Sequence, residues 1–133
     1  MDIIEVPFSI MRPGDIPRPW LPVLIKNPHA NLSVPVYGLI DTGADECAIP
    51  AGYAPLIGHD LQAGQQRTIF TGNGATVAYL HTLCLETNGI KIDNVLIDFM
   101  PNLNVVLLGV KSFLSNFELT VNYKKQFFAL KRL

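Results

Sequence analysis

The sequence predicts an all-β fold with one short helix near residues 110–117. Short runs rich in Val, Ile, Leu, Phe and Tyr recur along the chain and are separated by Gly, Pro and Asn, which is the pattern of strands joined by turns. Every second residue from Phe117 to Tyr123 is apolar, as in a strand with one buried face. With 133 residues, 49% of them apolar, the chain is long enough for a single domain with one core.

The first 19 residues are predicted to form an extended arm outside the core. They contain four prolines, at positions 7, 13, 17 and 19. Proline lacks the N–H group that a central strand must donate to its neighbours. We therefore expect an arm over residues 1–19 and a single domain over residues 20–133.

The first half of the domain is predicted to contain two long strands and a short one. Residues 21–26 and 34–40 are largely apolar, and the Asn-Pro-His-Ala-Asn segment between them is typical of a turn. The second strand leads directly into Asp41. Extended structure is expected to resume at residues 47–49.

A hairpin is predicted over residues 68–85, with the sequence Thr-Gly-Asn-Gly-Ala of residues 71–75 at its tip. Asn-Gly tolerates the positive φ angles that a tight turn requires. A second Asn-Gly pair, at positions 88 and 89, is expected to turn the chain into a strand over residues 90–99.

The last third of the chain is predicted to contain a buried strand, a helix and two more strands. Residues 105–108 are apolar on both faces, as in a strand inside the core, and Gly109 ends this run. Apolar residues then recur at i, i+3, i+4 and i+7 through residues 110–117, which predicts a helix with one buried face. A final strand is expected over residues 126–130.

The charge and the apolar runs exclude two classes of partner. Ten basic residues nearly balance 11 acidic ones, for a net charge of −1, so no basic surface for nucleic acid is expected. The strongest apolar run, residues 105–108, is far too short to cross a bilayer, and no basic leader or long apolar stretch precedes Pro7. We expect a cytoplasmic protein that binds neither nucleic acid nor membrane.

The cysteines and histidines do not predict a metal site. Cys47 and Cys84 are too few for a disulfide framework and are not spaced as metal ligands, so two buried thiols are expected. The three histidines are scattered along the chain, without ligand or triad spacing. We therefore expect no metal and no cofactor.

The segment Leu-Ile-Asp-Thr-Gly-Ala-Asp at residues 39–45 is the best candidate for chemistry. An apolar strand delivers the carboxylate of Asp41, the hydroxyl of Thr42 and Gly43 where the backbone must turn. A carboxylate in this position can have its pKa raised by desolvation and by a second carboxylate. Gly43 lets the main chain approach the group on which Asp41 acts. The same triplet also suits an ordinary turn after a strand, so by itself it leaves both interpretations open.

With its flanks included, the chain resembles the retropepsin-like aspartic proteases, the single-lobe family that includes the retroviral proteases. The resemblance covers about residues 18–130. Its features come in family order: residues 39–45, a glycine-tipped hairpin where the family has its flap, and residues 105–109 before a short helix. It implies a closed β-barrel of the retropepsin-like acid protease type, in which Leu108 and Gly109 lie beneath the catalytic loop.

The resemblance also implies a mechanism. Aspartic proteases activate a water between two carboxylates that share one proton, because two like charges so close together cannot both ionise. This sequence has one Asp-Thr-Gly, and its other acidic residues do not precede Thr-Gly or Ser-Gly. The second carboxylate must then come from another copy, so the resemblance implies a homodimer with Asp41, Thr42 and Gly43 of each subunit at the catalytic centre.

Further roles follow from the same resemblance. The residues expected to contact a peptide substrate are Ala44, Asp45, Gly72, Asn73 and Gly74. Arg18 resembles an arginine of the retroviral members that bridges to Asp45 of the partner subunit, although a solvated arginine is the alternative. The chain departs from the retroviral pattern at Val110, where those proteases have another arginine.

Two functions are compatible with these residues. The first is a homodimeric aspartic endopeptidase that binds an extended peptide as an added β-strand and hydrolyses it. The alternative is a non-catalytic dimeric peptide-binding module on the same fold, to which the missing arginine at Val110 gives some weight. The intact Asp41-Thr42-Gly43 favours the enzyme.

Overall fold

The computed structural model describes residues 3–133 and folds them mainly into strands. The strands are β1 (Ile3–Pro7), β2 (Trp20–Asn27), β3 (Leu32–Ile40), β4 (Cys47–Pro50), β5 (Gln65–Thr71), β6 (Gly74–Thr87), β7 (Ile90–Met100), β8 (Val106–Leu108), β9 (Phe117–Asn122) and β10 (Phe127–Arg132). The helical segments are α1 (Tyr53–Leu56) and the 3₁₀ helices η1 (Leu61–Ala63) and η2 (Leu114–Asn116). The predicted all-β fold is confirmed.

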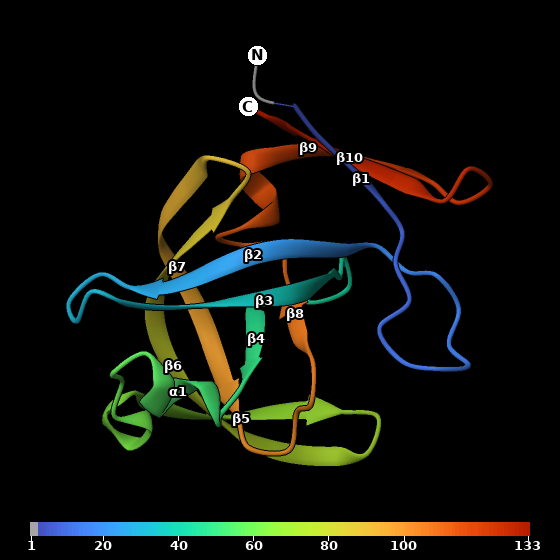
Figure 1. The fold of residues 1–133 in the computed structure, drawn as a ribbon. Coiled ribbons are helices and arrows are strands. Elements are labelled where there is room, and N and C mark those ends of the chain that lie inside the picture. Colours follow the sequence, from blue (N-terminus) through green and yellow to red (C-terminus); the bar gives the residue numbers. More distant parts are fainter. Residues whose placement is uncertain (1–2) are drawn as a thin grey trace.

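Six strands close into a barrel. They are hydrogen-bonded in the order β2-β3-β8-β4-β7-β6, and β6 pairs again with β2 to complete the ring. Within the ring, β3 runs parallel to β8 and β4 runs parallel to β7. Strand β5 lies at the edge of this sheet and forms an antiparallel hairpin with β6, which extends beyond the barrel in Figure 1. The closed barrel and the hairpin predicted over residues 68–85 are thus confirmed.

A second sheet brings the two ends of the described chain together. Strand β1 pairs antiparallel with β10, and β10 pairs with β9. In Figure 1 this sheet lies at the opposite end of the barrel from the β5–β6 hairpin. After β1 the proline-rich segment doubles back, and Ser9 forms an isolated bridge with Arg18. Ile4 of β1 is buried in the core, so this part of the expected arm packs into the fold rather than lying outside it. Pro7 is the last residue of an edge strand, where a missing N–H is tolerated.

Alternating apolar residues explain how the barrel acquires its core. In β2, Leu21 and Ile25 are fully buried, whereas Pro22 is exposed. Burying an aliphatic or aromatic side chain of this size contributes about 1.5–3 kcal/mol. The largest fully buried rings come from three separate parts of the chain: Phe99, Phe113 and Phe128. This core fixes where the strands end, and the candidate site is built at those ends.

The helix expected over residues 110–117 is shorter than predicted. The chain forms turns and then the 3₁₀ helix η2, and Val110 is 38% exposed although Phe113 is fully buried. The side-chain amide of Asn116 donates to the carbonyl oxygens of Ser112 and Phe113, at 3.0 and 2.9 Å. These bonds occupy acceptors that a longer helix would use, and the backbone becomes extended at Phe117 to pair with β10.

Candidate active site

The position of Asp41 is set by the parallel pair β3–β8. Ile40, the last residue of β3, lies opposite Leu108, the last residue of β8. The backbone N–H of Asp41 donates to the carbonyl oxygen of Leu108 at 3.0 Å, so this pairing extends one residue beyond the strand. The chain then turns at once, because the N–H of Ala44 donates to the carbonyl oxygen of Asp41 at 3.2 Å. Asp41 is therefore held at the rim of the barrel.

The carboxylate of Asp41 is oriented by its own loop. The backbone N–H of Gly43 donates to Asp41 Oδ1 at 3.0 Å. Asp41 is half-buried, whereas Thr42 and Gly43 are exposed. An N–H bond to a carboxylate oxygen favours a fixed side-chain direction. The arrangement presents a carboxylate of defined orientation at a surface that another molecule can reach.

The segment after β8 supports the loop from below. The N–H groups of Val110 and Lys111 donate to the carbonyl oxygens of Ala44 and Asp45, at 2.9 and 2.7 Å. Gly109 lies where the segment after β8 passes the Asp41 loop. A Cβ atom on Gly109 would lie 2.8 Å from the Ala44 carbonyl oxygen and closer still to the carbonyl oxygen of Glu46. Glycine at position 109 is thus required by this close approach.

A similar close approach occurs between the two parallel strands. Leu108 is fully buried, and a Cβ atom on Gly38 would lie 2.7 Å from Leu108 Cγ. Both residues predicted to lie beneath the loop, Leu108 and Gly109, are therefore found there. Gly38 was missed in the sequence, although a glycine inside an otherwise apolar strand is a signal of close packing.

A cleft of about 410 Å³ lies between this loop and strand β5. Its residues come from the loop, from β5 and from the barrel strands behind them: Gly43, Ala44, Asp45, Glu46, Ala48, Arg67, Thr68, Ile69, Phe70, Asp98, Met100 and Leu107. Phe70 is 81% exposed, an unusual environment for a large apolar side chain on a hairpin. The cleft therefore combines apolar walls with several charges.

The tip of the hairpin does not line this cleft. Gly72, Asn73 and Gly74 are exposed at the turn between β5 and β6. Asn73 instead lines a separate hollow of about 430 Å³, together with Leu103 and neighbouring residues of the loop after β7. Of the residues predicted to contact a peptide, Ala44 and Asp45 line the cleft, and the three tip residues do not.

An ion pair that the sequence analysis missed crosses the cleft. Arg67 on β5 binds both carboxylate oxygens of Asp98 on β7, with Arg67 Nε 2.8 Å from Asp98 Oδ1. Asp98 is only 3% exposed, and the hydrogen bond to it raises the pKa of Arg67 further above its usual range. The signal was present in the sequence, because an aspartate between Ile97 and Phe99 in an apolar run needs a partner when buried.

Arg18 has a partner within its own chain. Its guanidinium lies 3.2 Å from Asp15 Oδ1, and this hydrogen-bonded contact lowers the pKa of the Asp15 carboxyl. Lys111, which follows Val110, places its Nζ 3.5 Å from Glu46 Oε1. In the described chain Asp45 meets Lys111 through its backbone, whereas the side chains of Arg18 and Lys111 bind other carboxylates.

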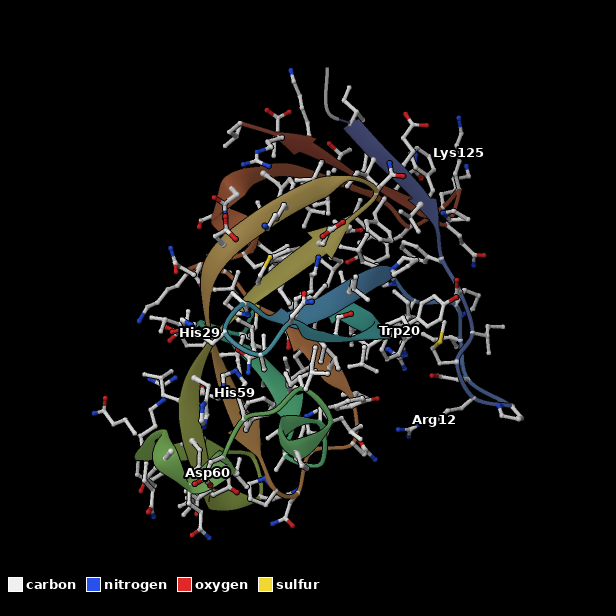
Figure 2. The ribbon with its side chains drawn as sticks, turned by 60° about the vertical axis from the view of Figure 1, so that its left-hand side comes forward. Arg12, Trp20, His29, His59, Asp60 and Lys125 are labelled. Carbon is white, nitrogen blue, oxygen red and sulfur yellow. The ribbon has the colours of Figure 1, made fainter. Side chains whose placement is uncertain are left out.

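Neither Cys47 nor the pair His59 and His81 lines the cleft beside the Asp41 loop. Cys47 is buried and accepts the N–H of Gly109 at 3.3 Å, and burial raises the pKa of its thiol to about 12, so it is not a thiolate nucleophile near neutral pH. Figure 2 shows His59 beside Asp60, at the α1 side of the barrel and well apart from Trp20 and Arg12. The ring of His59 packs 4.8 Å from that of His81.

Within residues 3–133, groups of three or more His, Cys, Asp or Glu side chains arranged to hold a metal ion are absent. The same part of the chain contains no helix that is long and apolar enough to cross a membrane.

Comparison with solved structures gives the same fold. A retropepsin-like aspartic protease from Rickettsia conorii is similar over 98% of this chain and 99% of that chain, with 25% sequence identity and a TM-score of 0.74. The EIAV protease complexed with the inhibitor HBY-793 is similar over 75% of this chain and 88% of that chain, with 20% identity and a TM-score of 0.52, a likeness of fold alone. No curated protein matches this chain in sequence.

The sequence also matches a protein family. A family model described as "gag-polyprotein putative aspartyl protease" matches residues 31–116, which include Asp41, Thr42, Gly43 and Gly109 and make up more than half of the chain. The resemblance inferred from the two motifs and the hairpin is therefore confirmed. The chain belongs to the gag-polyprotein putative aspartyl protease family and has the fold of the retropepsin-like aspartic proteases.

Proposed function

We propose that this protein is a homodimeric aspartic endopeptidase whose catalytic centre forms between two copies of the Asp41 loop. The observation that supports this most is the environment of Asp41, a half-buried carboxylate oriented by the Gly43 N–H beside a cleft lined by β5. Membership of an aspartic protease family adds support for peptide hydrolysis. The single Asp-Thr-Gly in the chain supports the need for a second copy.

In this proposal a water lies between Asp41 and Asp41 of the partner subunit. The two carboxylates share one proton, because their like charges disfavour double ionisation. The ionised carboxylate takes a proton from the water, the resulting hydroxide attacks the peptide carbonyl carbon, and the other carboxyl protonates the carbonyl oxygen. Collapse of the tetrahedral diol breaks the C–N bond as the amine receives a proton. Gly43 keeps each carboxylate oriented through its backbone N–H, and Thr42 lies beside the carboxylate on the exposed side of the loop.

The substrate in this proposal is a peptide in extended conformation. It binds between the Asp41 loop, with Ala44 and Asp45, and the hairpin, whose tip residues Gly72, Asn73 and Gly74 close over it. Closure excludes water and lets backbone groups of the hairpin bind the peptide. Leu108 and Gly109 support the loop, and Arg18 is proposed to exchange Asp15 for Asp45 of the partner subunit when the dimer forms.

A digest of a synthetic peptide library between pH 4 and 8 tests the chemistry. The wild type and the variants Asp41→Asn and Asp60→Asn are compared, since Asp60 is an exposed aspartate that belongs to neither the Asp41 loop nor the lining of the cleft. We expect cleavage by the wild type and by Asp60→Asn, and none by Asp41→Asn. Equal cleavage by wild type and Asp41→Asn contradicts the shared-proton mechanism, and no cleavage by any of the three favours the peptide-binding module.

Subunit mixing tests the dimer. Wild type and Asp41→Asn protein are mixed in equal amounts and allowed to exchange subunits before the assay. Because a mixed dimer has one Asp41, activity per wild-type chain is expected to fall to about half of its unmixed value, as random pairing of symmetric subunits requires. Activity that does not change on mixing, together with the sedimentation of a single chain, contradicts the proposal.

A further inference from the structure

The cleft beside the Asp41 loop is lined by four charged residues. Asp45 and Glu46 come from the loop, Asp98 from the barrel floor and Arg67 from β5. Three acids and one base thus line a volume of about 410 Å³. A ligand side chain that enters this space meets a negative environment.

Arg67 does not neutralise the whole of this charge. Its Nε and one terminal nitrogen bind the two carboxylate oxygens of Asp98 as a fork. Arg67 also remains 37% exposed through its side chain, at the β5 edge of the cleft. With Arg67 and Asp98 paired, the charges of Asp45 and Glu46 remain on the loop side.

Glu46 has an incomplete set of partners. Its side chain is 8% exposed, and Oε1 lies 3.5 Å from the ammonium of Lys111, which is itself largely in solvent. Oε2 is shielded from solvent and receives no hydrogen bond from any residue in the described range 3–133. A buried carboxylate oxygen without a donor is rare and costs free energy. A donor brought by a ligand would remove that cost.

We propose that this cleft is a specificity subsite for a lysine or arginine side chain of the peptide, with Glu46 as the main acceptor and Asp45 as the second. The aliphatic stem of such a side chain would pack against Ala48 and Leu107, which line the same space. An acidic side chain would meet the charges of Asp45 and of Glu46, which the largely exposed Lys111 compensates only in part, and is rejected. This assignment rests on the proposed function, because it takes the cleft as part of the substrate groove.

The subsite is tested by binding, so that the test does not depend on hydrolysis. Immobilised Asp41→Asn protein selects peptides from a randomised library of fixed length, and the retained peptides are sequenced. We expect Lys and Arg to be enriched about tenfold over Met at one position, with Asp and Glu depleted there. The same selection is repeated with Glu46→Gln and, as a matched control, with Glu118→Gln, an exposed acid on β9.

The expected result is that Glu46→Gln loses the enrichment and Glu118→Gln keeps it. If thermal denaturation shows that Glu46→Gln is not folded, Asp45→Asn replaces it in the selection. This variant changes an exposed side chain and is expected to reduce the enrichment by about threefold. Enrichment of apolar or acidic residues, enrichment that survives Glu46→Gln, or no retained peptides would each overturn the subsite. Incubating the selected peptides with wild type then tests the protease separately, because uncleaved basic peptides contradict only the enzyme.

Discussion

Asp41 and Asp98 are both delivered by apolar strands of the same barrel, yet they reach opposite environments. Asp41 follows the end of β3, is half-buried, and is oriented by a backbone N–H of its own loop. Asp98 lies inside β7, is almost fully buried, and is bound on both oxygens by Arg67. One carboxylate is oriented but accessible, and the other is neutralised in place.

The difference separates two uses of the same side chain. A carboxylate that transfers protons must keep an oxygen available to water, and its charge must be able to change during the reaction. A carboxylate that ties two strands together is most useful when its charge is fixed by a permanent partner. The pair Arg67–Asp98 joins the hairpin to the barrel floor, whereas the Asp41 loop leaves its carboxylate half-exposed at the rim of the barrel.

The largest expected effect is on activity when Asp41 loses its charge. Asp41→Asn is expected to reduce kcat/KM for a cleaved peptide by about 10²–10⁴-fold, because general acid–base catalysis is removed. Its melting temperature should stay close to that of the wild type, since a half-buried side chain with one backbone bond changes little in shape. Asp98→Asn is the matched control, and we expect it to keep activity within about tenfold of the wild type while losing stability. Kinetics and thermal denaturation of both variants measure these effects. A larger loss of activity in Asp98→Asn than in Asp41→Asn would contradict the roles assigned to the two carboxylates.

The next largest effect is expected on stability when Asp98 loses its ion-pair partner Arg67. Arg67→Met is expected to cost about 3 kcal/mol at pH 7, because Asp98 would be buried without a partner. Burial raises the pKa of an unpaired carboxyl above its value of about 4 in the unfolded chain. The loss should therefore grow as the pH rises above about 4 and be smallest in acid. Urea denaturation at several pH values measures this, and a loss that is greatest in acid would contradict the buried charge.

A smaller effect is expected from the support beneath Asp41. Gly109→Ala should cost about 1–3 kcal/mol, because the added methyl group overlaps the carbonyl oxygens of Ala44 and Glu46. Gly72→Ala is the control, since a Cβ atom there meets nothing within 4 Å, and it should change stability by less than about 0.5 kcal/mol. Chemical denaturation distinguishes the two, and equal effects would mean that the crossing beneath the loop is not tightly packed.

The smallest effect concerns the acid side of the stability profile. Burial, followed by the charges of His81 and His29, lowers the pKa of His59. The unfolded chain takes up a proton near pH 6.5, but the folded chain does so only at lower pH. Stability is therefore lost as the pH falls from 6.5 through the folded pKa of His59.

His59→Gln should flatten this part of the profile, and the exposed control His29→Gln should change it much less, because burial is the larger cause of the lowered pKa of His59. Thermal denaturation of the three proteins between pH 5 and 7.5 measures the difference. Parallel curves for wild type and His59→Gln would show that His59 does not titrate in this range. The same curves show whether any loss of peptide cleavage between pH 7.5 and pH 5 is caused by unfolding.

Local patterns predicted the strands well and the helical segments poorly. Alternation and turn residues located β2, β3, β6, β7 and β9 because each pattern acts within a few residues. The segment 110–117 has a helical stripe, yet it is interrupted by the side-chain bonds of Asn116 and by the need to reach β10. Helix α1 was not predicted, because a single turn of four residues carries no periodic signal.

The candidate site divides in the same way. Asp41, Thr42, Gly43, Leu108 and Gly109 could be found because short motifs of a known family mark them. The partners Arg67 and Asp98 are 31 positions apart and belong to no such motif. The ion pair between Arg18 and Asp15 was not predicted either, because the sequence does not show which of several acidic residues an arginine will bind in the folded chain.

The all-β class, the carboxylate at the end of an apolar strand and the single Asp-Thr-Gly can be read from residue types and their short-range order. Which charges meet in the cleft, which carboxylate is neutralised and which acceptor on Glu46 lacks a donor are known only from the folded chain. Electrostatic and hydrogen-bond partners depend on distance in space rather than on separation along the chain. Barrel closure sets those distances by bringing together strands that are far apart along the chain.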